Sequence, residues 1–282
     1  MTGIRPILIL LFPVVLLAQP IDITQWERIL LPLANRPTPG GFGSLWESSF
    51  VLYNAGAHTL DPNIPLSDIF PFDSGCYFPP CAKRPLIPPG TASAPMLWQT
   101  KVGHPPGLLL YVRRTLVDDV AFNLRIQDVS RQALTWGTEI PVVRERELRT
   151  GVIDLLDVPT DGRFRVALRV YDPYQEPRTR PDATTSWVKI ELFSMESQEL
   201  IASRTAELVQ PPIENLCGAP TAGITCWPGS FEIHHLVNEF PAIAASDRIR
   251  VRITPLTPGL RMWAFANVTN NETQHVTTIT PH

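Results

Sequence analysis

Short segments of the chain alternate hydrophobic and polar residues, and turn residues separate these segments. Every second residue from Phe164 to Val170 is apolar, whereas Arg165 and Arg169 lie between the apolar positions. Because successive side chains of a β-strand point to opposite faces, this period predicts a strand with one apolar and one polar face. Strands of this kind are typical of antiparallel sheets with one face in water. The same period recurs at 120–126, 188–192 and 248–253.

Turn signals lie between the alternating segments. The sequence Pro159-Thr160-Asp161-Gly162 precedes the segment at 164–170, and Thr257-Pro258-Gly259 follows the one at 248–253. Asn270-Asn271 precedes a last strand at 274–279, where we expect a closing hairpin. The chain also contains 30 Pro, a residue that breaks helix interiors. We therefore predict an all-β chain, with at most a short helical turn at 213–216 and at 239–245. Further strands are predicted near 45–53, 96–101, 108–113, 120–127 and 139–143.

The length of 282 residues fits about two domains. We predict a signal peptide at 1–18, a first β-sandwich domain at 19–143 and a second, immunoglobulin-like β-sandwich domain at 144–282. The boundary lies at Arg144-Glu145-Arg146-Glu147, a charged stretch where we expect few contacts, or else the exposed start of a strand. Each half is long enough to bury a core of its own.

The N-terminus has the pattern of an export signal. Arg5 provides a positive charge, the run from Ile7 to Leu17 is apolar apart from Pro13, and Ala18 is a candidate cleavage residue. This run is shorter than the ~20 apolar residues that a membrane-spanning helix needs. An uncut membrane anchor is the alternative. We predict a mature chain without a membrane span, located in the medium, the periplasm or at the cell surface.

The four Cys fall into two pairs that are close in sequence, Cys76 with Cys81 and Cys217 with Cys226. Four Cys allow three connectivities, and we favour the two local disulfides because each pair shares a loop rich in Pro and Gly. Disulfides agree with export, since they persist in oxidising compartments. A metal site is the alternative, but neither spacing is Cys-x-x-Cys and no His lies within either loop.

Three short segments carry a resemblance, at 29–32, 41–46 and 263–271. Together with the order of the strands, with Trp263 in the segment 262–268 and with the final hairpin, they resemble secreted bacterial tandem β-sandwich proteins of the immunoglobulin or fibronectin type. The resemblance implies export and a β-rich fold, and it brings no active residues to transfer. The chain departs from antibody domains, because no Cys lies in a predicted strand to link two sheets.

The charge and the motifs exclude several classes of function. The net charge is −3, with Asp and Glu outnumbering Lys and Arg, whereas nucleic-acid binders usually show a clustered basic excess. The sequence has no G-x-S-x-G elbow, H-E-x-x-H helix, phosphate loop or dinucleotide fingerprint. We therefore predict no catalytic residues, no cofactor, no metal and no nucleic-acid partner.

Three weaker groups of residues remain as candidates for chemistry. His235 and Glu239 would share one face of a helix and could hold a metal with His234, but the preceding residues favour a strand. Asp118-Asp119 is a pair of carboxylates whose side chains would point apart on a strand. An acidic loop could bind Ca²⁺ through oxygen ligands, although it lacks the spacing of an EF-hand. Its polar residues are Asp61, Asn63, Asp68 and Asp73.

Arginine rows and tryptophans indicate a binding surface instead. Arg165, Arg169, Arg250 and Arg252 lie on the polar sides of two predicted strands and could form one face for an acidic polymer. The alternative is that these arginines pair with acidic residues across strands. The leading hypothesis is a non-enzymatic exported protein that interacts with an extracellular protein or a glycan. A carbohydrate-binding module and a hydrolase with an unrecognised site are the alternatives. The carbohydrate-binding alternative rests on the seven Trp, which could include a stacking platform for sugars. They are Trp26, Trp46, Trp98, Trp136, Trp187, Trp227 and Trp263.

Overall fold

Antiparallel β-sheets make up most of the described part of the protein, so the prediction of an all-β fold is confirmed. The α-helix found among these residues is the four-residue α1 (Leu236–Glu239). No helix in this part of the chain is long and apolar enough to span a membrane. The predicted signal peptide and all four Cys lie outside the described residues. The computed structural model describes residues 23–33, 38–61, 69–70, 85–93, 96–97, 107–130, 136–174, 185–209 and 227–282.

The first half of the chain forms two sheets, which we number 1 and 2. Sheet 1 has the order β2 (Thr38–Pro39), β3 (Leu45–Asn54), β8 (Val120–Asp128), β9 (Thr138–Ile140), and β5 (Thr91–Ala92) and β6 (Met96–Leu97) also pair with β3. Sheet 2 has the order β10 (Val143–Arg144), β1 (Trp26–Leu31), β7 (Leu108–Arg113), β4 (Ile69–Phe70). Short 3-10 helices precede or connect these strands: η1 (Ile23–Gln25), η2 (Gly41–Gly43), η3 (Val117–Asp119) and η4 (Glu145–Glu147).

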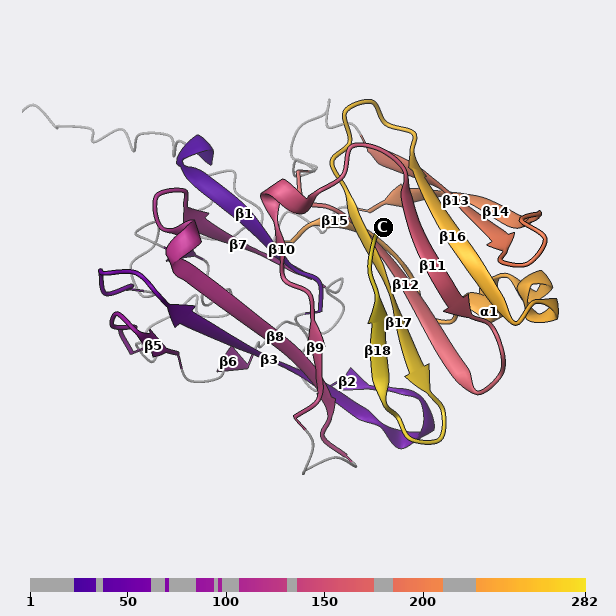
Figure 1. The fold of residues 1–282 in the computed structure, drawn as a ribbon, viewed down its shortest axis with the longest axis horizontal. Helices are drawn as coiled ribbons and strands as arrows, with labels where there is room; N and C mark the ends of the chain where they lie inside the picture. The colour runs from indigo at the N-terminus through magenta and orange to yellow at the C-terminus, as the bar shows by residue number, and fades with distance from the viewer. Residues whose placement is uncertain are drawn as a thin grey trace, which may run out of the picture.

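The second half forms two further sheets, numbered 3 and 4. Sheet 3 has the order β15 (Gly229–Ile233), β12 (Phe164–Asp172), β17 (Trp263–Asn270), β18 (Val276–Ile279). Sheet 4 has the order β11 (Ile153–Pro159), β16 (Arg248–Pro255), β13 (Ser186–Ser194), β14 (Leu200–Leu208). The helix α1 and η7 (Pro241–Ala245) lie between β15 and β16 along the chain. Figure 1 shows the strands of the two halves side by side, with α1 on the side of the second half that is away from the first half.

The core of the second half lies between sheets 3 and 4. Val166 and Leu168 of β12 are buried in the same cluster as Ile190 of β13 and Val251 of β16. These are the apolar positions of the alternating segments, so the predicted inward faces of these strands are confirmed. A turn at 160–163 joins β11 to β12, as the Asp161-Gly162 signal predicts.

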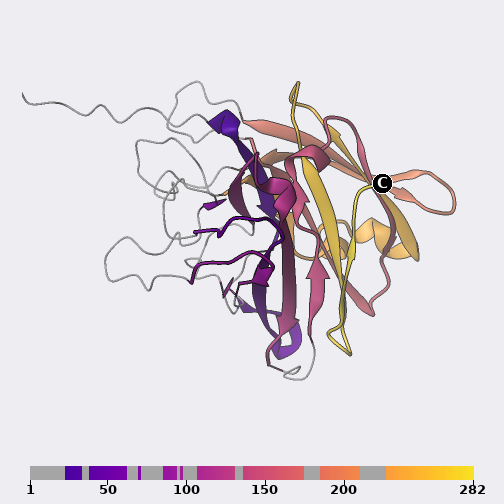
Figure 2. The same ribbon diagram turned by 60° about the vertical axis from the view of Figure 1, so that its left-hand side comes forward.

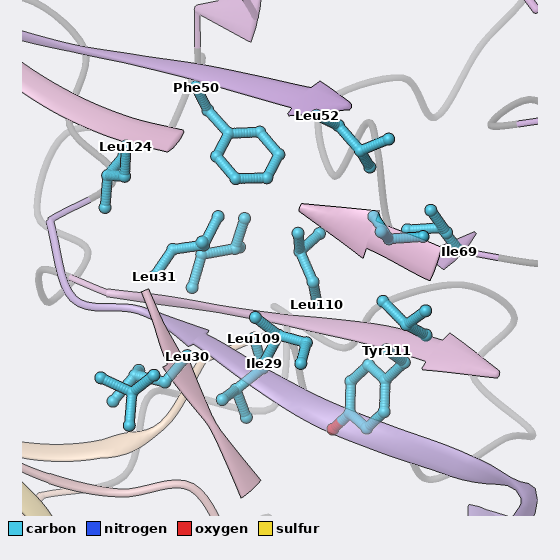
Figure 3. Packing of buried hydrophobic residues seen from close by; sticks show 14 of the residues in the cluster. Ile29, Leu30, Leu31, Phe50, Leu52, Ile69, Leu109, Leu110, Tyr111 and Leu124 are labelled. Carbon is cyan, nitrogen blue, oxygen red and sulfur yellow. The ribbon is translucent and has the colours of Figure 1, made fainter. Parts of the chain in front are cut away.

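The core of the first half lies between sheets 1 and 2. Phe50 and Leu52 of β3 extend toward Leu31 of β1 and Leu110 of β7 (Figure 3), and all four side chains are buried. Both β1 and β7 consist largely of consecutive apolar residues rather than alternating ones. Such runs are typical of strands that are covered on both faces.

The second cover of sheet 2 is sheet 3, which belongs to the other half of the chain. Tyr171, Trp263 and Phe265 of sheet 3 belong to the hydrophobic cluster of the first half, as does Trp227, which lies just before β15. The hydroxyl of Tyr171 donates a hydrogen bond to the carbonyl of Pro32 at 2.5 Å. The view in Figure 2 keeps the strands of the two halves in adjacent layers. The four sheets therefore stack in the order 1, 2, 3, 4.

This stacking corrects the expectation that the polar face of each alternating strand lies in water. The polar side of β12 faces the first half, because the neighbouring strand β17 places Trp263 and Phe265 on the same side and in the first-half core. A second correction concerns 139–143, which is not one strand. The chain leaves sheet 1 after Ile140, passes Pro141 and enters sheet 2 at Val143, so the predicted boundary after residue 143 falls inside β10.

Replacement of Gly137 by alanine is expected to destabilise the protein by about 1–3 kcal/mol, because the backbone here is left-handed. Gly137 has φ of 67°, and a Cβ atom would lie 2.3 Å from the carbonyl oxygen of Ile126. Urea denaturation of the variant measures this loss. Gly151→Ala is the matched control, because nothing lies within 4 Å of its added Cβ. Equal stability of the two variants would contradict the assigned backbone at Gly137.

Candidate functional site

The four arginines expected to form one face lie in two different sheets. Arg165 and Arg169 belong to β12 in sheet 3, whereas Arg250 and Arg252 belong to β16 in sheet 4. Sheets 3 and 4 face each other across the second core, so their polar sides point in opposite directions. The single basic face expected from the sequence does not form.

Arg165 and Arg169 lie on the side of sheet 3 that faces the first half. Arg169 donates to the Oδ1 atom of Asn267 at 2.6 Å and forms an ion pair with Glu232. Its guanidinium also lies 5.9 Å from the ring centre of Phe265. The guanidinium of Arg165 lies 4.9 Å from the ring centre of Phe42, which belongs to the first half. The contact between Arg165 and Phe42 joins the two halves, whereas these partners of Arg169 all belong to sheet 3.

Arg250 and Arg252 lie on the polar side of sheet 4, which we call the outer face. It consists of these outward side chains of β11, β13 and β16: Asp154, Trp187, Lys189, Glu191, Phe193, Arg250 and Arg252. The register places Asp154, Arg252 and Glu191 in one row across three strands, and Arg250 opposite Phe193 in the next row. None of these residues belongs to either buried cluster.

Charge and aromatic contacts organise the outer face. Arg252 donates to both carboxylate oxygens of Asp154, at 3.1 and 3.3 Å, and this ion pair raises the pKa of Arg252. The guanidinium of Arg250 lies 4.6 Å from the ring centre of Phe193, and that of Arg252 lies 5.7 Å from it. Because the acidic and basic side chains pair with one another, the face is a mixed surface rather than a basic one.

The described tryptophans divide into buried and exposed groups. Trp26, Trp227 and Trp263 are core residues, and Trp46 packs against the core of the first half. Trp187 is 40% exposed on the outer face, and Trp136 is 86% exposed beside β9 of sheet 1. One exposed ring lies on sheet 4 and the other lies just before β9 of sheet 1, so the two do not form one stacking platform. Trp98 lies outside the described residues.

A second polar feature lies where the two halves meet, and we call it the arginine cluster. It consists of Arg28, Arg114, Glu145, Tyr174 and Arg261. Glu145 accepts a hydrogen bond from Arg114 at 2.6 Å and another from the hydroxyl of Tyr174. Its Oε1 atom lies 3.9 Å from Arg28 and 3.8 Å from Arg261. The guanidiniums of Arg28 and Arg261 lie 4.2 and 4.8 Å from the ring centre of Tyr174.

The cluster shifts the pKa values of its acidic groups in opposite directions. Burial alone would raise the pKa of Glu145, but hydrogen bonds from Tyr174 and Arg114 and the charges of Arg114 and Arg28 lower it. Burial, followed by the hydrogen bond to Glu145, raises the pKa of Tyr174 to about 12. Glu145 is therefore a carboxylate and Tyr174 a neutral phenol at neutral pH. A carboxylate stabilised in this way is suited to ion pairing rather than to proton donation.

The expectation of few contacts at 144–147 is wrong. Arg144 forms a two-bonded ion pair with Glu27 and a further one with Asp118, and Glu145 is the centre of the arginine cluster. The sequence offered one signal: Glu145 follows β10 directly, so sheet pairing with β1 brings it toward Arg28. The other partners come from distant parts of the chain, which local patterns cannot connect.

The remaining sequence candidates are placed separately. His234 is largely exposed with its Nδ1 atom 3.4 Å from Glu232, His235 precedes α1, and Glu239 pairs with Arg204. Asp118 and Asp119 lie in the 3-10 helix η3 rather than on a strand. No group of three or more metal-ligating side chains occurs within the described ranges. Of the candidate Ca²⁺ ligands, Asp61 is described, whereas Asn63, Asp68 and Asp73 are not.

Comparisons with known proteins add no relative to this picture. No family model, no curated protein and no solved structure matches the chain.

Proposed function

We propose that this chain is an exported, non-enzymatic interaction protein that binds a protein partner through the outer face of sheet 4. The observation that carries the proposal is the composition of that face, where Trp187, Phe193 and two arginines stand on a rigid sheet. Trp and Arg are the residues most enriched at the energetic centres of protein interfaces. The mutual pairing of Asp154 with Arg252 favours a protein partner over an acidic polymer.

Rigidity supports this proposal as much as composition does. The face belongs to three neighbouring strands whose other side is packed into the second core. Sheet 3 is in turn packed against the first half. The outer face therefore belongs to a sheet that is backed by two further sheets, 3 and 2. A preorganised surface loses little conformational freedom on binding, which favours affinity. In this proposal, packing against the first half holds the sheets of the second half in place.

We also infer that the second half is an immunoglobulin-related sandwich with exchanged edge strands. β12 pairs with β15 and β13 pairs with β16, as strands B with E and C with F do in an immunoglobulin domain. In that fold, strand A lies beside B and strand G beside F. Here β11 lies beside β16 and β17 lies beside β12. Export by a cleaved signal peptide at 1–18 remains part of the proposal and rests on the sequence pattern.

Site-specific crosslinking tests the proposed surface. A photo-crosslinking amino acid at position 187 or 193, in protein made by its native producer, is expected to yield a defined adduct with a partner protein. Tyr53 is the matched control, because it is an aromatic residue of similar exposure on sheet 1. Equal adducts from position 53, or none from positions 187 and 193, would contradict a binding role for the outer face.

The alanine variant of Trp187 measures the size of the effect. Once the partner is purified, Trp187→Ala is expected to weaken binding by at least about tenfold, since truncated aromatic anchors typically cost ~2 kcal/mol or more. Calorimetric titration provides the measurement. Tyr53→Ala should leave the affinity unchanged. An unchanged affinity for Trp187→Ala would place the contact elsewhere.

A carbohydrate-binding module is the second candidate, supported by the exposed ring of Trp187 on a flat sheet. Exposed aromatic rings can stack against the apolar faces of sugars. Affinity electrophoresis in gels containing soluble polysaccharides separates the two candidates. Retardation that disappears in Trp187→Ala would favour the glycan, whereas unretarded migration in all gels would favour the protein partner.

A further inference from the structure

The arginine cluster contains more positive than negative charge. The guanidiniums of Arg28, Arg114 and Arg261 surround the single carboxylate of Glu145, so two positive charges lack a counter-charge within the cluster. The neighbouring carboxylates of Glu27 and Asp118 are already paired with Arg144. Like charges held close together in a partly buried site repel one another unless an anion neutralises them.

The carboxylate and the arginines differ in their access to water. The side chain of Glu145 is 10% exposed, whereas those of Arg114 and Arg261 are 48% and 36% exposed. Glu145 therefore forms the floor of the cluster, and the arginines extend from it toward the solvent. An incoming anion can approach the guanidiniums without displacing the carboxylate beneath them.

Hydrogen-bond donors remain on the exposed arginines. Arg114 donates from Nε to the carbonyl of Thr24 at 2.9 Å and from Nη2 to Glu145, and its Nη1 donates to no other described residue. Arg261 donates from Nη1 to Tyr174 and from Nη2 to the carbonyl of Glu145, at 2.6 and 2.7 Å, and its Nε likewise donates to no described residue. Planar guanidinium groups with free donors match the oxygens of phosphate and sulfate.

The arginines are also held in place before any ligand arrives. The ring of Tyr174 lies against the guanidiniums of Arg28 and Arg261, and its hydroxyl is fixed by Glu145 and Arg261. The ordering of these long side chains is thus achieved during folding. A preordered site of this kind loses less entropy on binding than free surface arginines would.

We propose that the arginine cluster is a binding site for a doubly charged oxyanion, phosphate or sulfate, on the solvent side of Glu145. The charge of such an anion equals the two uncompensated positive charges of the cluster. The site is separate from the outer face, because its residues come from β1, from η4 and from the segments that follow β7, follow β12 and precede β17. Arg28, Arg114 and Glu145 belong to the first-half side of the cluster, so a bound anion also strengthens the contact between the halves.

Calorimetric titration of the full chain with sodium phosphate and with sodium sulfate tests this proposal, with sodium chloride at equal ionic strength as the reference. We expect saturable binding of phosphate or sulfate and a higher unfolding temperature in its presence, because a ligand specific for the folded state stabilises it. Absence of saturable binding to the wild-type chain with both anions would overturn the proposal, whatever the variants do.

Two variants with opposite expected effects make the test specific to the cluster. Arg114→Gln removes one positive charge and the N–H donors of one guanidinium group. It should weaken phosphate or sulfate binding by at least about tenfold. Glu145→Gln raises the net positive charge of the cluster and should tighten binding. Circular dichroism verifies that each variant is folded under the conditions of the titration.

Arg248→Gln is the matched control, because Arg248 is an exposed arginine paired with Asp157 at 3.0 Å on sheet 4. It should bind phosphate and sulfate as the wild type does. If Arg248→Gln weakens binding as much as Arg114→Gln, or if folded Glu145→Gln binds more weakly than the wild type, the anion site does not lie in the arginine cluster.

Discussion

Replacement of Phe265 by alanine is expected to destabilise the protein by about 3–5 kcal/mol, the usual cost of removing a buried phenylalanine. Phe265 is fully buried, and its ring centre lies 5.1 Å from that of Trp263 and 6.4 Å from that of Tyr171. Its strand belongs to sheet 3, but its side chain lies in the core of the first half. The cavity would therefore open between the two halves.

The same placement predicts how the chain unfolds. Because residues of the second half complete the core of the first, we expect both halves to unfold in one cooperative transition. Urea denaturation followed by tryptophan fluorescence and by far-UV circular dichroism should give coincident curves for the wild type. In Phe265→Ala, both curves should move to lower urea concentration by the same amount.

Phe193→Ala is the matched control for Phe265→Ala. Phe193 lies on the outer face in contact with Arg250, and it belongs to neither buried cluster. Phe193→Ala should lower the free energy of unfolding by clearly less than Phe265→Ala does. Two separate transitions, of which Phe265→Ala shifts only one, would contradict the packing of sheet 3 against sheet 2.

The second large effect is expected for Glu145→Gln, which should destabilise the protein by about 1.5–3 kcal/mol, the usual contribution of hydrogen bonds to a charged group. The substitution leaves Arg28, Arg114 and Arg261 without a carboxylate, while their side chains stay partly buried. It also weakens the hydrogen bond that Tyr174 donates. Urea denaturation near neutral pH provides the measurement.

The pH dependence of stability follows from the lowered pKa of Glu145. A carboxyl group whose pKa is lower in the folded than in the unfolded state binds its proton more readily when unfolded. Its contribution to stability is therefore complete above the ordinary value of 4.5 and is lost as the pH falls below that value and through the lowered folded pKa. The stability difference between the wild type and Glu145→Gln should accordingly shrink below about pH 4.5.

Glu239→Gln is the control for this charge effect. Glu239 pairs with Arg204 at 2.9 Å, but both side chains are about half exposed, with fractions of 51% and 45%. Exposed ion pairs contribute ~0–1 kcal/mol, so this variant should remain close to the wild type at neutral pH. If Glu145→Gln and Glu239→Gln both lose little free energy of unfolding, burial does not strengthen the ion pairing of Glu145.

Local pattern was sufficient for several strands of the second half, although it did not predict β14. The alternation of Val166 and Leu168 with arginines predicted β12, and the Asp161-Gly162 turn predicted its start. A strand has only two faces and a turn needs particular residues, so both signals are readable within a few neighbouring positions. The strand β7 at 108–113 was also predicted, although its continuous apolar run does not alternate and so did not indicate which face was inward.

Local sequence patterns could not predict which partners the arginine side chains contact. Glu145 meets Arg114 across 31 residues of sequence and Arg261 across 116, and Arg28 is also distant in the sequence. Arg165 and Arg169 show the same periodicity as Arg250 and Arg252, yet the first pair faces the first half of the chain and the second pair lies on the outer face. Period alone cannot tell a polar face in water from a polar face against another sheet.

The sequence by itself determined that this chain is built from β-strands, where most of them lie, and which side chains of the second half point into its core. The tertiary structure alone decided that four sheets stack, which polar face stays in water, and which charges meet between the halves. The physical reason is the distance in sequence over which each interaction acts. Strand period and turn chemistry act between neighbouring residues, whereas the packing of sheet 2 on sheet 3 depends on the whole folded chain.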